Sequence, residues 1–316
     1  MPKPNMSRGK IQFCAPTATA MLHAGVLKKF GLYGLIRIAL PLMPDGAKHW
    51  LHVLAFLCLG NLLFAGWVAM RQRNLNLLIG NSSVAHMGFA FLGIASLSLI
   101  GVTGAVVVMV AHGLLAALTF GLSGYLYQQT GTLQMDKLGG LLKKIPFIGT
   151  AMIIAMFAGC GLPGFANFVG EMTVLFGAWK SLPWLVVAGA WGALIIGAVY
   201  MLRAIRNILH GPLPEKWATI PDANHWRKVP FALLIVSLLV FGFFPRLLTD
   251  KITPSAQAIV NMATKTTEQK TADSGAGLWP AWTGVPPVIR ETRFASETLA
   301  PAGGTPAPLP SPLHNP

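Results

Sequence analysis

The feature that most constrains this chain is the apolar stretch from residue 147 to residue 179, which is long enough to cross a membrane. A helix-breaking run containing Gly161, Pro163 and Gly164 interrupts it, and an acidic residue, Glu171, follows two turns later. Broken backbone at membrane depth is tolerated only where protein or a watery cavity surrounds it, and such breaks mark ion sites in transporters. We therefore predict a discontinuous membrane helix that carries a proton or a cation.

Glu171 is the only one of the ten acidic residues that falls inside an apolar span. A carboxylate near the centre of a bilayer costs several kcal/mol unless it is paired, protonated or hydrated, so it is a functional-site candidate by default. A purely structural carboxyl that pairs two helices is the alternative. The helix break beside it favours a protonatable relay site.

Composition indicates an all-α, polytopic transmembrane helix bundle. Of the 316 residues, 53% are hydrophobic and 11% are charged, and several apolar runs exceed the length of about 18–20 residues that a spanning helix needs. The net charge of +14 is compatible with nucleic-acid binding, but the Lys and Arg residues lie mainly in short loops. There they are topology signals and lipid-headgroup contacts, so we expect a bilayer and no nucleic acid as a partner.

The apolar runs predict about seven spans, with boundaries uncertain by several residues. They cover approximately Thr17–Leu40, Trp50–Met70, Leu75–Ile100, Val102–Gln128, the broken segment Phe147–Trp179, Leu182–Ile208 and Val229–Leu248.

The loop charges predict an orientation and a domain division. With seven spans, the N-terminus and three loops on its side hold thirteen Lys or Arg, whereas the opposite short loops hold only Lys48 and Lys180. The N-terminus is therefore expected in the cytoplasm and the C-terminal tail on the opposite face. The predicted parts are a cytoplasmic lead (1–16), a transmembrane domain (17–249) and a tail (250–316). The tail is expected to be largely disordered, with an amphipathic or frayed helix up to about Lys270.

Basic side chains inside the spans are the partners expected for Glu171. Lys28 and Lys29 are adjacent in the first span, and adjacent residues point about 100° apart on a helix, so only one of them can face the bundle interior. A lone buried histidine is more often a hydrogen-bonded core residue than a relay. Three of them, His112, His86 and His23, form a better case, because neutral imidazole both donates and accepts a proton.

Other motifs are few. Five glycines are expected at close helix contacts: Gly25, Gly31, Gly34, Gly121 and Gly124. The sequence has no nucleotide-binding loop, no haem or iron–sulfur ligand set, no metal-ligand spacing and no hydrolase elbow. We therefore expect no cofactor, no metal and no redox chemistry on this chain.

Several motifs resemble the antiporter-like proton-pumping subunits of NADH-quinone oxidoreductase (respiratory complex I). They are HAGVLKKFGLYGL, NSSVAHMGFAFLGI, VMVAHGLLAALTFGLSGYLYQQTGT, LGGLLKKIP and GLPGFANFVGEMTVLFGAW. They extend over about Ala15–Trp179, and the layout continues to about Leu248. The pair Gly170-Glu171 is similar to chain M, because the sister chains L and N have lysine there.

The resemblance implies a fold of two inverted five-helix repeats, each with a broken helix, and a row of Lys, His and Glu along the midplane. This chain is similar to the C-terminal half, with the second repeat at 50–208. By motif, Glu171 matches the glutamate of the second broken helix, Lys29 matches the central lysine, and His112 and His86 match the family histidines. NADH, FMN, iron–sulfur clusters and quinone are then expected in partner subunits, and the location is the bacterial inner (plasma) membrane.

The chain also departs from the family pattern. The first repeat, with its own glutamate and broken-helix lysine, has no counterpart in this sequence. Asn74-Leu75-Asn76 replaces the usual acidic and basic pair, and His23 stands where chain M usually has an aliphatic residue. A natural short form, one half of a split gene and a fragment of a longer reading frame all remain open.

Three functions are compatible with these features. The preferred one is a proton-translocating subunit that couples redox energy released in other subunits to transfer along a Lys/His/Glu relay, which would make the chain part of a translocase. The second is a membrane subunit of a hydrogenase-type complex or of a multi-subunit cation/proton antiporter. The third is a truncated, non-conducting fragment.

Overall fold

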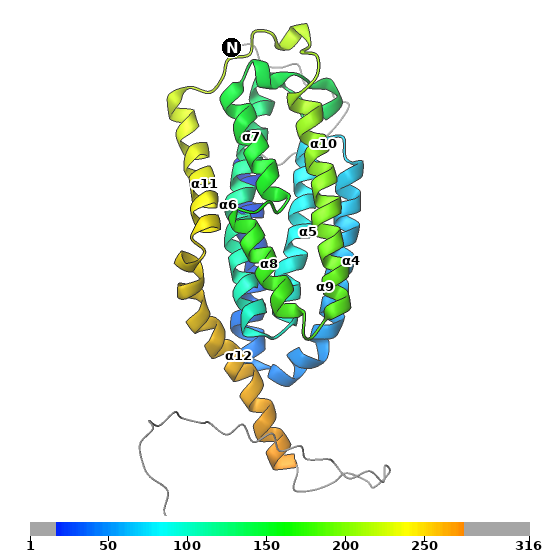
Figure 1. Cartoon of the computed structure of the whole chain (residues 1–316), viewed down its shortest axis with the longest axis vertical. Coiled ribbons are helices and arrows are strands. Elements are labelled where there is room, and N and C mark those ends of the chain that lie inside the picture. The colour runs from blue at the N-terminus through cyan, green and yellow to red at the C-terminus, as the bar shows by residue number, and fades with distance from the viewer. Residues whose placement is uncertain (1–16, 275–316) are drawn as a thin grey trace, which may run out of the picture. The chain divides into compact units, whose positions relative to one another are not determined.

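The computed structural model describes residues 17–274, and within this range the chain is built from helices and connecting loops (Figure 1). An isolated bridge between Asn74 and Gln134 is the only strand-like pairing of the described residues. The predicted all-α class is confirmed. The predicted lead, 1–16, and the last part of the tail, 275–316, lie outside the described residues.

The first helical stretch runs without a gap and alternates between α and π geometry. Its segments are α1 (Thr17–Leu22), η1 (His23–Leu27), α2 (Lys28–Gly34), η2 (Leu35–Ala39) and α3 (Leu40–Leu42), of which η1 and η2 are π-helical.

Three long helices follow, and α6 lies at the centre of the bundle. They are α4 (Pro44–Arg71), α5 (Leu75–Ala95) and α6 (Leu99–Thr130). The helix α6 packs against α5, against the first helical stretch and against helices later in the chain. The side chains of Asn74 and Ser98 accept hydrogen bonds from backbone N–H groups of the first turns of α5 and α6 respectively, which is why these two helices begin there.

The second half of the described chain is more segmented. Its elements are η3 (Met135–Lys137), η4 (Leu141–Lys143), α7 (Pro146–Gly159), α8 (Ala166–Ala178), α9 (Pro183–Trp191), η5 (Gly192–Ile196), α10 (Gly197–Leu209), η6 (Glu215–Trp217), α11 (His225–Phe243) and α12 (Arg246–Ser274).

The predicted break in the fifth span is confirmed between α7 and α8. Gly161 and Gly164 have φ angles of +69° and +99°, in the region that residues with a Cβ rarely enter. Pro163 between them has no backbone N–H to continue a helix. The other predicted spans are also helical. Four helices of the described chain, α4, α5, α6 and α11, are long and apolar enough to cross a membrane by length and composition.

The end of the seventh span differs from the prediction. The helix α11 ends at Phe243 rather than near Leu248, because Pro245 interrupts the backbone before α12 begins at Arg246. The predicted tail boundary at residue 250 therefore falls inside α12, which continues to Ser274, beyond the expected helix end near Lys270.

Small residues set the closest helix contacts. A Cβ on Gly104 of α6 would lie 2.7 Å from the backbone N of Val174 on α8, and a Cβ on Gly177 would overlap the backbone of Gly101. Such approach strengthens van der Waals packing, which drives helix association in a membrane. The sequence prediction named five other glycines. A Cβ on Gly121 would lie 3.0 Å from the Phe231 ring and one on Gly124 would overlap the Thr17 side chain, so for these two the prediction is confirmed. Gly31 and Gly34 have open space beside them, so for these two residues the close-packing prediction is wrong.

The three loops predicted to share the basic face do lie together. The N–H of Leu75 donates to the carbonyl of Leu133 at 2.9 Å, and the N–H of Gly140 donates to the carbonyl of His210 at 3.0 Å. These loops lie at the upper end of the helices in Figure 1. The hydroxyl of Ser98 reaches the Gly177 carbonyl at the other end, at 2.8 Å.

We expect Gly177→Ala to lower the apparent Tm of the purified chain in detergent by several degrees. The new methyl group would force α8 away from α6, and overpacking of this kind costs about 1–3 kcal/mol. Gly31→Ala is the matched control, since its Cβ meets nothing within 4 Å and alanine favours helix over glycine. Equal Tm values for the two variants would show that close approach at the Gly101–Gly177 contact does not contribute to the thermal stability of the bundle.

Candidate functional site

Four ionisable side chains from four helices meet in the interior of the bundle. Glu171 comes from α8, His86 from α5, His112 from α6 and Lys29 from α2. Their exposed fractions are 3%, 7%, 2% and 8%, so all four are buried. We refer to these four residues as the polar row.

Direct contacts connect most of the polar row. Oε1 of Glu171 lies 3.0 Å from Nδ1 of His86, and Nζ of Lys29 lies 2.8 Å from Nδ1 of His112. The lysine also donates to the backbone carbonyl of Ala24. Between the two pairs, the imidazole rings of His86 and His112 are tilted by 51° with centroids 5.7 Å apart. The row therefore runs from the broken helix across α5 and α6 to the first helical stretch.

The helix break and the carboxyl group belong to one site. A Cβ on Gly161 would lie 2.7 Å from Oε2 of Glu171, so the carboxyl rests directly against the backbone of the break. Only glycine combines this close approach with the positive φ angle found there. We call this contact the glycine cradle.

Two water-sized cavities flank His86, each of about 10 Å³. The first is lined by Glu171 and Tyr200, and the second by His112 and Ser83. Nε2 of His86 has no hydrogen-bond partner among the described residues. A polar cavity of about 10–15 Å³ is just large enough for a single water molecule.

Hydroxyl groups support the polar row from the side. Nζ of Lys28 lies 3.4 Å from Oγ of Ser83, while the Tyr200 hydroxyl donates to Oγ of Ser82 at 3.0 Å. Lys29 is buried and Lys28 is half-buried. Of the two adjacent lysines, one thus faces the interior and the other reaches a polar neighbour.

His23 is the candidate that the structure leaves outside the polar row. Its side chain is exposed, and none of the contacts among the described residues joins it to the other candidates. Six residues separate it from Lys29, which places the two side chains about 120° apart on a regular α-helix. The π-helical segment η1 between them changes the phase further.

Two residues near the row were missed by sequence reasoning. Asn167 is 1% exposed, and neither polar atom of its side chain has a partner among the described residues. It lies four residues before Glu171 on α8, a spacing that puts both on one helix face and was the available signal. Tyr200 had no comparable local signal.

The donor set does not suggest a metal. Within residues 17–274, no group of three His, Cys, Asp or Glu side chains is placed to hold a metal ion. The chemistry that the polar row can support is proton exchange between nitrogen and oxygen atoms, because each member has a protonated and a deprotonated form.

The comparisons with known proteins agree with this geometry. Residues 10–196, more than half of the chain, match the family described as NADH:quinone oxidoreductase/Mrp antiporter, TM. The chain is 32% identical over 247 residues to NADH-quinone oxidoreductase subunit M of Rickettsia felis, an alignment that covers 78% of this chain and 50% of the relative. It is 35% identical over 251 residues to F(420)H(2) dehydrogenase subunit M of Methanosarcina mazei, covering 79% and 50%.

A solved structure shows the same fold. The chain superimposes on a chain of respiratory complex I from Thermus thermophilus with a TM-score of 0.73 and 31% identity, covering 78% of this chain and 52% of that one. The chain spans about half the length of the curated relatives it matches. The resemblance to the antiporter-like subunits is confirmed: this chain belongs to the family of NADH:quinone oxidoreductase/Mrp antiporter transmembrane subunits.

Proposed function

We propose that this chain is a proton-translocating membrane subunit of a redox-driven complex similar to NADH-quinone oxidoreductase, and that protons move along the polar row. The observation that carries the proposal is the connection of four buried ionisable groups across four helices, with contacts of 2.8 Å and 3.0 Å at its two ends. Buried charges of this kind are costly in a membrane and mark proton relays.

The transfer steps follow from the geometry. The Lys29 ammonium gives a proton to Nδ1 of His112, which then holds protons on both ring nitrogens and releases one from Nε2. A water molecule in the small cavity between the rings takes this proton and passes another to Nε2 of His86, the nitrogen without a partner. His86 then gives up the proton on Nδ1 to Oε1 of Glu171. In each step one N–H or O–H bond breaks and one forms. Both histidines end neutral but in the opposite tautomer, so each ring must return its proton to the other nitrogen, by rotation or by exchange with water, before a second proton can follow.

Glu171 is the terminal site in this proposal. Its Oε2 lies in the glycine cradle, and the neighbouring residues of the break, Leu162 and Pro163, are exposed on the surface of the described chain. The break therefore lies between Glu171 and the surface of the described chain, with α11 packed against it at Gly164. In an assembled complex, another membrane subunit covering the break would complete the release path.

Partners and location follow from the same proposal. Neighbouring membrane subunits would surround the bundle, and the subunits that hold NADH, FMN, iron–sulfur clusters and quinone would supply the energy. The basic loops would face the cytoplasm of a bacterial inner membrane, because positively charged loops are retained there. The N-terminus would lie on that side and the tail on the other.

A second candidate function has the same proton relay in a different kind of membrane complex. One relative is named as a subunit of F(420)H(2) dehydrogenase, and the family description includes the Mrp antiporter. The same bundle can therefore be proposed for a complex with another electron donor or for a cation/proton antiporter. Sodium-dependent proton flux without electron transfer would favour the antiporter, and a non-conducting fragment would show neither activity.

We expect Glu171→Gln to abolish proton translocation while electron transfer continues. The amide keeps the size of the side chain but cannot cycle between protonated and charged forms. The measurement is the proton-to-electron ratio of the assembled complex in proteoliposomes, with a fluorescent pH-gradient dye and the rate of donor oxidation. Glu215→Gln, at an exposed residue of η6, is the matched control and should leave the ratio unchanged. A normal ratio in assembled Glu171→Gln complex would refute the role.

Gly161→Ala tests the glycine cradle separately. The added methyl group would displace Oε2 of Glu171. The rate of proton translocation and the infrared carboxyl band of Glu171 should therefore both change. The band is assigned by its loss in Glu171→Gln. Gly131→Ala introduces the same strained conformation, with φ of +67°, but has open space around it. Both variants are expected to lose about 1 kcal/mol or somewhat more of stability. Identical infrared bands in the two variants would show that Gly161 does not position the carboxyl.

A further inference from the structure

We propose that a groove between the first helical stretch, α6 and α12 binds an anionic phospholipid, with the phosphate between Arg37 and Lys251 and an acyl chain beside Lys29. The groove consists of two cavities that share part of their wall. Lys29 lines the groove, whereas its partner His112 does not.

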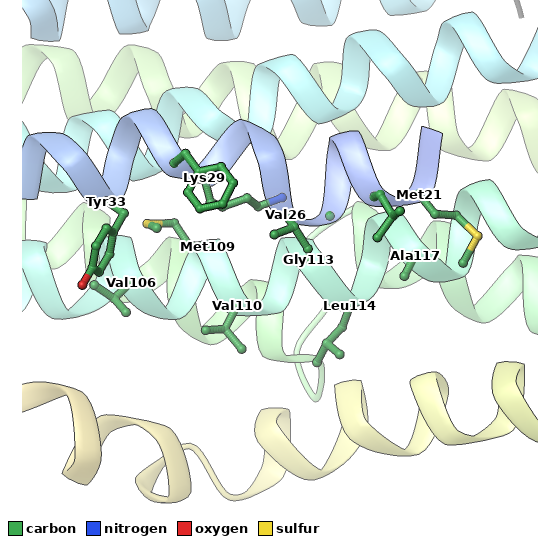
Figure 2. Close-up of a pocket in the computed structure, with 13 residues that line it drawn as sticks. Met21, Val26, Lys29, Tyr33, Val106, Met109, Val110, Gly113, Leu114 and Ala117 are labelled. Carbon is green, nitrogen blue, oxygen red and sulfur yellow. The ribbon is translucent and has the colours of Figure 1, made fainter. Parts of the chain in front are cut away.

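The apolar part of the groove is a cavity of about 670 Å³ between the first helical stretch and α6. Figure 2 shows its two walls, with Val26 and Tyr33 from the first stretch opposite Met109, Val110 and Leu114 from α6. The Lys29 side chain also lies in this wall. A surface so uniformly apolar suits a hydrocarbon chain.

The polar part is a second cavity of about 350 Å³, where α12 approaches the first stretch and α6. It shares Tyr33, Val106 and Met109 with the first cavity, so the two form one continuous groove. Both volumes lie within the range of about 300–1,000 Å³ that is usual for ligand sites. Arg37 and Lys251 contribute the charge of this second cavity.

The two cations have no protein partner in the described chain. Neither Arg37 nor Lys251 forms an ion pair or a hydrogen bond with residues 17–274, and both are exposed. Asp250, the acidic neighbour of Lys251 on α12, does not line the cavity. A guanidinium group binds phosphate oxygens in a bidentate manner and an ammonium group adds a point charge. The hydroxyl groups of Tyr33 and Ser255 in the same cavity are further donors.

The depth of the site matches a lipid. Arg37 lies eight residues after Lys29, about 12 Å along the helix at 1.5 Å per residue, and five residues before the end of the stretch at Leu42. A headgroup at Arg37 would thus lie near the end of the helix, and its acyl chain would extend inward past Lys29. Free phosphate could use the cations but would leave the apolar part unfilled, which is why we commit to a lipid.

Occupancy would affect the relay, and this consequence rests on the proposed function. An acyl chain in the groove covers the hydrocarbon stem of Lys29 and excludes water from that side. The Lys29 ammonium then exchanges protons only with His112, 2.8 Å away. The lipid would thus prevent water from exchanging protons with Lys29 at this end of the polar row.

The test is lipid retention by the purified chain, measured by native mass spectrometry after equilibration with nanodiscs. The two probes are phosphatidylglycerol and phosphatidylcholine with identical acyl chains. We expect retention of phosphatidylglycerol to exceed that of phosphatidylcholine by about tenfold, which corresponds to about 1.4 kcal/mol. Both lipids carry the phosphate, but phosphatidylcholine adds a quaternary ammonium group that Arg37 and Lys251 would repel. Inorganic phosphate should not displace the lipid.

Three variants locate the site. Arg37→Gln with Lys251→Gln should remove the preference for phosphatidylglycerol, while Lys180→Gln, an exposed lysine outside the groove, should keep it. Val110→Trp should reduce retention of both lipids by filling the apolar part. Circular dichroism and Tm measurements identify any variant that fails to fold, and the wild-type comparison of the two lipids does not depend on the variants.

Several results would overturn the proposal. They are equal retention of the two lipids by the wild-type chain, displacement of the lipid by inorganic phosphate, or an unchanged preference in the folded Arg37→Gln, Lys251→Gln chain. These measurements involve no proton transport, so their failure leaves the role of Glu171 untouched. Conversely, a normal proton-to-electron ratio in Glu171→Gln would refute the pump without affecting lipid binding.

Discussion

The contact between Glu171 and His86 is the interaction on which the rest of the structure depends. A buried carboxyl in an apolar bundle is several kcal/mol unfavourable unless a partner compensates it, and His86 provides that partner at 3.0 Å. The second carboxyl oxygen lies against Gly161, where no side chain would fit. The break in the helix is therefore a condition for burying the acid and not a separate irregularity.

Helix packing determines whether this contact can form. The glycine contacts of α6 with α8, at Gly101–Gly177 and Gly104–Val174, hold the two helices at nearly backbone distance. Gly93 on α5 meets the same region, because a Cβ there would lie 2.9 Å from the Val174 side chain. These three helices carry His86, His112 and Glu171. Close packing without bulky side chains therefore sets the spacing of the polar row.

The two ends of the polar row lie in different surroundings. At Glu171 the row ends against irregular backbone that reaches the surface of the described chain, whereas at Lys29 it ends in the wall of an apolar groove. Irregular backbone at membrane depth occurs where protein buries it or where it lines a water-filled cavity, whereas the groove at the other end is lined by apolar side chains. Under the proposed function, this asymmetry would distinguish the release end of the relay from the loading end.

The amino-acid sequence alone determined the all-helical class, the apolar segments, the break at 160–165 and the location of the three basic loops at one end of the bundle. These features depend on local composition and on residues such as Gly161 and Pro163. It also identified the four members of the polar row as candidates. Only the tertiary structure decided that His23 lies outside the row, that Asn167 and Tyr200 lie beside it, and that Arg37 and Lys251 line one cavity. Contacts between residues more than 80 positions apart, such as Lys29 with His112, depend on helix packing and on the phase change at a π-helical segment, which periodicity along one helix does not contain.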